Sequence, residues 1–158
     1  MYRDALEFLD EEREAWRPFE ALADLPDDAL ERPIEAVNGW SGRDLMGHLA
    51  AWLEVALATA RELAVADDSA TRARADAEWA AGGDAMNENL RRTWAALPLD
   101  EVRRRFAVVP GELRGYLTVV PESRWLKHAA HLRSFEEDTI EHYAEHRADL
   151  EAVLAAAR

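Results

Sequence analysis

The sequence contains no cysteine, which excludes disulfides, thiolate zinc sites and cysteine nucleophiles. It also lacks a glycine-rich phosphate-binding loop, a serine nucleophile elbow and basic segments interleaved with aromatic residues. These absences argue against kinases, dehydrogenases, serine hydrolases and nucleic-acid-binding proteins. The functional classes that remain are those that rely on other side chains, such as histidine and the carboxylates.

Long apolar runs are absent as well. No segment approaches the roughly 18 residues of a membrane helix, and the N-terminal segment MYRDALEFLDEE has no apolar core typical of a signal peptide. The formal net charge is −13, which disfavours binding to nucleic acids and to anionic membranes. We therefore expect a cytoplasmic protein whose partner is a small molecule, with neither nucleic acid nor membrane as a partner.

The composition favours helices. Of the 158 residues, 49% are hydrophobic and 32% charged, which is ordinary for a globular protein. Alanine, glutamate, leucine and arginine dominate while isoleucine is rare, so helix is preferred over sheet. We predict an all-α chain that forms a single domain over residues 1–158.

Apolar residues recur at helical spacing in several segments. Pro18 and the Pro110-Gly111 pair are expected to kink or break the helices that contain them. Residues 67–84 are polar and contain Gly82-Gly83, which predicts a long connection. The long helices are predicted at residues 2–25, 41–66, 99–119 and 127–156, and a short one at 84–97.

Four long amphipathic helices with short connections predict an up-down four-helix bundle. The long connection and the short extra helix lie between its second and third helices. In the second helix, Ser41 followed by Asp44 resembles a capping box, which predicts that this helix begins at Ser41.

The segment HYAEH places His142 and His146 four residues apart, on one face of the last helix. Both lie at the border between the apolar stripe and the polar face, and His48 occupies a similar border on the second helix. Three imidazoles that converge at one end of a groove suit a metal site with open positions for water or substrate. The alternative is that each histidine edges the core and forms its own hydrogen bond.

His128 and His131 begin the same last helix. His131 lies three turns before His142, too far to bind the same ion. We interpret both as helix-terminus or surface residues. Glu141 and Glu145 flank the histidine pair in sequence and are expected to point elsewhere, toward solvent.

The stretch GWSGRDLMGHLAAW, residues 39–52, resembles the second-helix signature of the DinB/YfiT-like superfamily. The matching residues are Trp40, Ser41, Asp44, His48 and Trp52, and the last helix of that family carries a His-x-x-x-His pair like His142 and His146. The segments TIEHYAEHRADL and MNENL are most similar to the ClbS/DfsB-like branch.

This resemblance implies a four-helix bundle with a divalent metal on His48, His142 and His146, nickel or zinc being the leading choices among metals that accept imidazole. It also implies a homodimer, for which six tryptophans supply apolar area. Besides their packing and capping roles, Trp40, Asp44 and Trp52 are candidate pocket-lining residues. No catalytic residue is identified.

Two functions follow from this interpretation. The first is a metal-dependent hydrolase, or a transferase or isomerase using a low-molecular-weight thiol as cosubstrate, that acts on a small electrophile. The second is a small-molecule-binding or self-protection protein without metal-dependent turnover.

Overall fold

The computed structural model describes all 158 residues, and it contains helices but no strand. The prediction of an all-helical chain is confirmed. None of the helices combines the length and the apolar character needed to cross a membrane. The helices are α1 (Ala5–Trp16), α2 (Asp27–Glu31), α3 (Gly42–Val65), α4 (Ala70–Ala95), α5 (Leu99–Leu117), α6 (Ala129–Asp138), α7 (Ile140–Glu145) and α8 (Arg147–Ala156), with short 3-10 turns at Arg17–Asp24, Glu35–Val37 and Glu122–Arg124.

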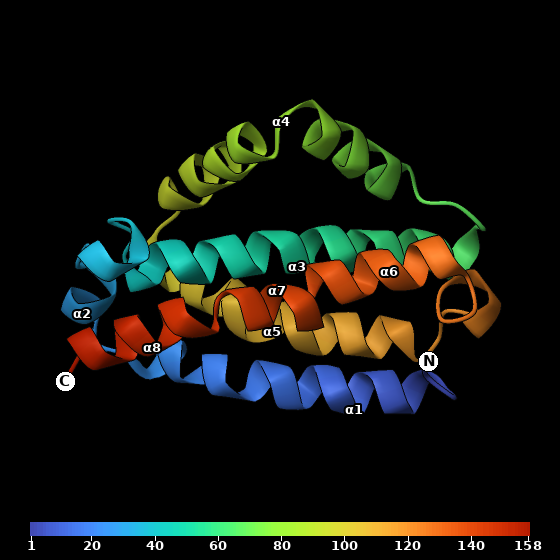
Figure 1. Cartoon of the computed structure of the whole chain (residues 1–158), viewed down its shortest axis with the longest axis horizontal. Helices are drawn as coiled ribbons and strands as arrows, with labels where there is room; N and C mark the ends of the chain where they lie inside the picture. Colours follow the sequence, from blue (N-terminus) through green and yellow to red (C-terminus); the bar gives the residue numbers. More distant parts are fainter.

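Four helical rows lie along the long axis of the molecule: α1, α3, α5 and the succession α6–α8 (Figure 1). Helix α4 arches over α3, on the side away from α1 (Figure 1). On α3, Glu54 and Arg61 form ion pairs with Arg105 and Glu112 of α5, in that order along both helices. Helices α3 and α5 therefore run parallel, because α4 returns the chain between them, and the plain up-down order is wrong for this pair.

Helix α4 differs most from the sequence prediction. Residues 67–84 were expected to form a connection, but the helix already begins at Ala70, after Ser69 caps it by accepting a hydrogen bond from the Arg72 amide at 3.0 Å. Gly82 has non-helical angles and divides α4 into two arms. Hydrophobic periodicity missed the first arm because it buries few side chains, whereas its alanines and arginines favour helix by intrinsic propensity.

Two proline predictions have different outcomes. Helix α1 ends at Trp16 and a 3-10 turn with Pro18 near its start follows, as expected for a split first helix. Helix α5 instead continues through Pro110 without interruption. Pro110 and its neighbour Val109 are both buried, so packing compensates for the hydrogen bond that proline cannot donate.

The last predicted helix is broken twice. Thr139 leaves helical geometry between α6 and α7, with φ −126° and ψ −97°, and its hydroxyl donates to the Phe135 carbonyl at 2.5 Å. His146 separates α7 from α8. A threonine hydroxyl that bonds the carbonyl four residues earlier is a known source of helix bending, and periodicity alone does not reveal it.

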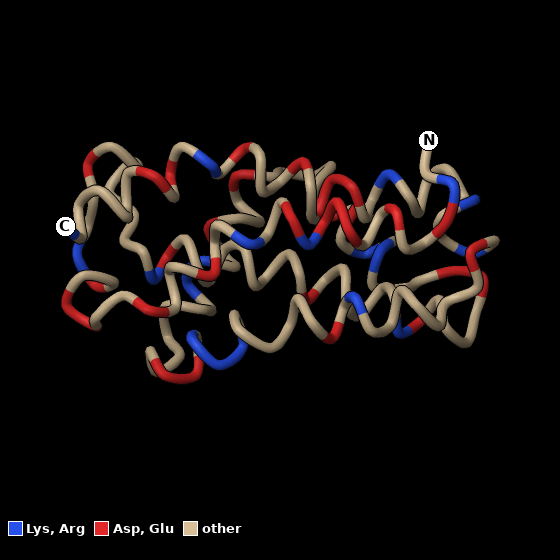
Figure 2. The backbone as a smooth tube through the Cα atoms, turned by 90° about the horizontal axis from the view of Figure 1, so that it is seen from below, with Lys and Arg blue, Asp and Glu red and all other residues tan.

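Charged residues occur along the whole length of the chain's fold (Figure 2). Asp and Glu number 32 against 19 Lys and Arg. Several ion pairs join residues one turn apart on one helix, such as Arg104 with Glu101 and Arg133 with Glu137. Such exposed pairs contribute little stability individually, so the surface charge bears on solubility and association rather than on the fold.

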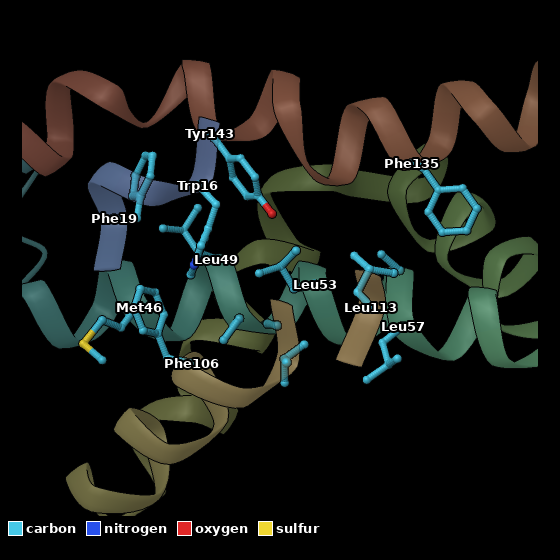
Figure 3. Packing of buried hydrophobic residues seen from close by; sticks show 14 of the residues in the cluster. Trp16, Phe19, Met46, Leu49, Leu53, Leu57, Phe106, Leu113, Phe135 and Tyr143 are labelled. Carbon is cyan, nitrogen blue, oxygen red and sulfur yellow. The ribbon is translucent and has the colours of Figure 1, made fainter. Parts of the chain in front are cut away.

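The main hydrophobic core is a continuous cluster of 31 buried residues between the helical rows. At its centre the rings of Trp16 and Phe106 lie 4.8 Å apart, and those of Trp16 and Tyr143 lie 5.1 Å apart (Figure 3). These residues come from α1, α5 and α7, so the aromatic cluster joins the N-terminal, central and C-terminal parts of the chain.

A buried polar network crosses this core. Glu12 is 1% exposed, and its carboxylate accepts hydrogen bonds from the Tyr143 hydroxyl at 2.8 Å and from Arg114 Nε at 2.5 Å. Burial raises the pKa of Tyr143 well above its usual value, and Glu12 adds to this effect. Tyr143 is therefore an un-ionised donor, and Glu12 connects α1 with α5 and α7.

We predict that Glu12→Ala destabilises the protein by about 3–5 kcal/mol, because Arg114 and the Tyr143 hydroxyl would lose their buried partner. Urea unfolding followed by circular dichroism measures this change. Glu14→Ala on the same helix removes only an exposed pair with Arg17 and is expected to cost less than about 1 kcal/mol. Equal effects of the two substitutions would contradict the role of Glu12.

Candidate metal centre

Three histidines from distant parts of the chain meet at one place. His48 lies on α3, His142 on α7 and His146 between α7 and α8, and each offers a ring nitrogen within 4.8 Å of the other two. Their ring centroids are 4.7–4.8 Å apart. The structure therefore brings together the three residues that the sequence singled out.

The breaks in the C-terminal row do not disturb the spacing of the histidine pair. The His146 amide still donates to the His142 carbonyl at 3.2 Å, so the two residues remain one helical turn apart. His48 reaches them from α3, where the close contact of Gly42 with Leu30 and Val153 holds α3 beside α2 and α8.

The hydrogen bonds of His48 and His142 are incomplete. Their Nε2 atoms face each other at 2.8 Å, while both Nδ1 atoms are buried without a partner. In a neutral pair one Nε2 donates and the other accepts, so the accepting ring carries its proton on an Nδ1 that finds no acceptor. The alternative that each histidine forms its own complete set of hydrogen bonds therefore fails for these two residues.

His146 has a different environment. Its Nδ1 lies 2.7 Å from Asp149 Oδ2, which leaves Nε2 available to a ligand. A carboxylate on the outer nitrogen is the usual partner of a metal-binding histidine, because it sets the tautomer and the ring orientation. Asp149 was missed in the sequence, although an acidic residue three positions after a histidine on a helix is a signal that can be searched for.

Burial keeps two of the imidazoles neutral. Burial, together with the neighbouring histidines, lowers the pKa of His48 to about 3 and that of His142 to about 2. A metal ion binds only the deprotonated ring, so these residues present lone pairs at neutral pH without first losing a proton.

The arrangement fits a divalent ion. Nitrogens bound to one ion at about 2.0–2.1 Å stand roughly 3 Å apart. The 2.8 Å between His48 and His142 is close to this spacing, whereas the three nitrogens together span up to 4.8 Å and would draw closer around an ion. Three neutral imidazoles match nickel, zinc, cobalt and iron(II). No fourth histidine, cysteine or carboxylate belongs to the cluster, so an ion held by these three residues would keep coordination positions open.

The histidines line a cavity of about 450 Å³, a size typical of small-molecule sites. Trp40 and Trp52 line it as well. A second cavity of about 380 Å³, between α3 and α5, is lined by arginines and glutamates and has no histidine. The other residues that line the first cavity are Arg72, Asp76, Trp79, Asn87, Arg133, Glu137, Asp138, Glu141 and Glu145.

Local structure positions both predicted tryptophans. A turn through Asn38 and Gly39, whose φ angles are +53° and +81°, brings Trp40 against His48 with ring centroids 5.2 Å apart. The indole Nε1 of Trp52 donates to Asn87 Oδ1 of α4 at 3.0 Å.

Asp44 lies outside the cavity. It completes the predicted capping box, since its Oδ2 accepts from the Ser41 amide at 3.0 Å and Ser41 Oγ accepts from the Asp44 amide at 3.2 Å.

His128 caps α6 by accepting from the His131 amide at 3.3 Å, and His131 Nδ1 lies 2.6 Å from the Arg124 carbonyl. Both therefore belong to the start of α6, as expected.

Two expectations are corrected. Glu141 and Glu145 were expected to point away from the histidines, yet both line the cavity. The residues that α4 contributes, among them Arg72 and Trp79, were missed because the first arm of α4 was taken for a connection. Only the tertiary position of α4 above α3 identifies them as part of the site.

The chain matches no protein-family model, no curated protein and no solved structure. The chemistry of the cavity is therefore interpreted from its own residues and geometry.

The lowered pKa values predict how stability depends on pH in the metal-free protein. Between about pH 3 and pH 6.5 the unfolded chain binds protons at His48 and His142, whereas the folded chain does not. The free energy of unfolding therefore falls as the pH drops below about 6.5, by up to ~1.4 kcal/mol per pH unit for each histidine. The His48→Gln/His142→Gln variant lacks these two titrating groups and so loses this contribution to the pH dependence. Urea unfolding between pH 6.5 and 4.5 should give a steeper loss for the wild type, whereas parallel curves would contradict the lowered pKa values.

Proposed function

We propose that this protein binds a divalent metal ion through His48, His142 and His146, and that it is an enzyme acting on a small electrophilic molecule. The observation that carries the proposal is the convergence of three imidazoles within 4.8 Å in a cavity of about 450 Å³. Two of them are buried, neutral and incompletely hydrogen-bonded, which is costly for a site with no ligand to bind.

Nickel and zinc are the leading candidates among the metals that imidazole accepts. When bound, such an ion lowers the pKa of a coordinated water or thiol and supplies a nucleophile at neutral pH. Because the chain has no cysteine, a thiol would have to enter as a low-molecular-weight cosubstrate. The reaction is then a hydrolysis, or a thiol-dependent transfer or isomerisation.

The protein side chains have separable roles in this proposal. His48 and His142 lie in the buried wall of the cavity, and each would offer the lone pair of a ring nitrogen to the ion. Asp149 holds the ring of His146 in the orientation that leaves Nε2 free. Trp40 packs edge-on against His48 and shields it from bulk water on that side. The rest of the cavity binds and orients the substrate.

The resemblance to the DinB/YfiT-like superfamily supports the same proposal. In that interpretation α1, α3, α5 and the row α6–α8 are the four members of a bundle, with α4 as its long crossover. The second helix of the family, which carries the signature with His48, then corresponds to α3. The last helix of the family, which carries the histidine pair, corresponds to the row α6–α8 with His142 and His146.

We predict that protein purified without a histidine tag takes up about one equivalent of nickel or zinc, and that His48→Ala or His146→Ala weakens binding by more than about 100-fold. Asp149→Asn, which removes only the orienting carboxylate, should weaken it by about 10–100-fold. Isothermal titration and elemental analysis measure both effects. His128→Ala is the control and should retain wild-type binding, since His128 caps α6 away from the site. Equal metal content in all variants would disprove the site.

A second function competes with catalysis: binding and shielding of a reactive compound without turnover. The observation that favours it is the direct contact between His48 and His142, since a hydrogen bond at 2.8 Å holds the two rings together without any ion. In this alternative the cavity is a receptor and its histidines belong to the wall.

Turnover separates the two functions. We predict that a screen of small electrophiles, each with and without low-molecular-weight thiols, yields many equivalents of product per protein, and that a chelator or His48→Ala abolishes this product. Protection limited to one equivalent of compound and unaffected by chelation would support the binding protein instead.

A further inference from the structure

The cavity beside the histidines has an unbalanced set of charges. Its wall carries five carboxylates and two guanidinium groups. Both arginines are already paired: Arg72 Nη1 lies 2.6 Å from Asp138 and its Nε lies 2.8 Å from Asp76, while Arg133 Nε lies 2.7 Å from Glu137. Arg72 is buried and engaged by two carboxylates, whereas the pair of Arg133 is exposed and uses only Nε, so carboxylates dominate the charge of the wall.

Two carboxylates of the wall have no partner. Glu141 and Glu145 form neither an ion pair nor a side-chain hydrogen bond, and both are exposed. They lie one helical turn apart along α7, so both can face one ligand. The wall therefore offers two free negative charges next to His142 and His146.

Aromatic faces complete the wall. Trp40, Trp52 and Trp79 come from three segments of the chain, and the rings of Trp52 and Trp79 lie 5.6 Å apart in an edge-to-face arrangement. Trp79 is 51% exposed, whereas Trp52 is buried and its ring lies 6.4 Å from that of His142. Tryptophan rings thus lead from solvent to the histidines.

The position of Trp79 depends on a glycine. A Cβ at Gly83 would stand 2.9 Å from the outer ring atoms of Trp79, so a larger residue there would displace the indole from its present contact with α4. Few other side chains on this outer surface of α4 are buried. Trp79 therefore presents a half-exposed indole in the wall of the cavity.

We infer that the electrophilic substrate of this cavity carries a small organic cationic group, an ammonium or a quaternary ammonium. Tryptophan faces attract such cations, free carboxylates complement their charge, and the excess of five carboxylates over two guanidinium groups in the wall disfavours an anion. His48 and His142, whose buried Nδ1 atoms have no partner, line the same cavity. The inference rests on the proposed function, since it takes the cavity beside the metal site as the substrate site.

The net charge of −13 supports the same ligand class. A surface with this excess of acidic groups attracts cations over long range and raises their rate of encounter. The binding of a cationic substrate should accordingly weaken as ionic strength rises.

Three probes of nearly the same shape test the inference: choline, its neutral isostere 3,3-dimethylbutan-1-ol, and the anion 3,3-dimethylbutanoate. Binding to the full-length protein is followed by tryptophan fluorescence and by isothermal titration. We expect choline to bind at least about tenfold more tightly than the alcohol and the anion not to bind, because charge is the main difference among the probes.

Matched variants locate the binding. Glu141→Gln/Glu145→Gln should weaken choline binding by about tenfold and leave the alcohol unaffected, and Trp79→Leu should weaken choline binding by several-fold. Glu151→Gln makes a similar change in charge on α8, at a residue paired with Arg147 and outside the cavity, and should have no effect. All these residues are exposed, so the variants are expected to fold.

Metal binding is measured on the same samples, which separates the two proposals. If metal is not taken up but choline binds with the expected selectivity, the metal-dependent function is wrong and the cation inference stands. If metal binds normally while the three probes bind alike, none of them binds, or Glu141→Gln/Glu145→Gln leaves choline binding unchanged, the cation inference is wrong.

Discussion

The burial of α3 between its neighbours is the constraint on which the rest of the structure depends. This helix packs against α2, α4, α5, α6 and α8, and most of its side chains are buried. A Cβ at Gly47 would lie only 3.0 Å from the Trp94 side chain. Because glycine has no Cβ, Trp94 can pack closely here, and the end of α4 contacts the start of α3. A helix enclosed in this way cannot rotate without breaking several interfaces, so His48 is held at a defined place in the interior.

The candidate site depends on that position. His48 is presented by α3, while His142 and His146 are presented by a row of short helices whose breaks lie at Thr139 and at His146 itself. The core secures this row from the other side, since Tyr143 is adjacent in sequence to His142 and donates to the buried Glu12. Packing of the core and the geometry of the histidines are therefore coupled through consecutive residues of α7.

Helix α4 forms the outer wall of the cavity and is attached differently from the other helices. A small separate cluster of Trp52, Ala75 and Met86 joins it to α3, and the buried Arg72–Asp138 pair joins its first arm to α6. Burial raises the pKa of Asp138 to about 7, against the opposing effect of Arg72. The first arm of α4, which precedes the division at Gly82, buries only Arg72 and Ala75 and is therefore less tightly integrated into the core than the second arm with Trp94.

The sequence by itself determined the helical class, the start of α3 at its capping box and the identity of the three histidines, because propensity, capping and residue spacing act over one or two turns. It also identified Trp40 and Trp52. Only the tertiary structure decided that α3 and α5 run parallel and that α4 covers the site with Trp79. It also decided that Glu141 and Glu145 line the cavity, and that His146 forms a hydrogen bond with Asp149. These features depend on contacts between segments far apart in sequence and on breaks inside helices, and the periodicity of a single helix contains no information about either.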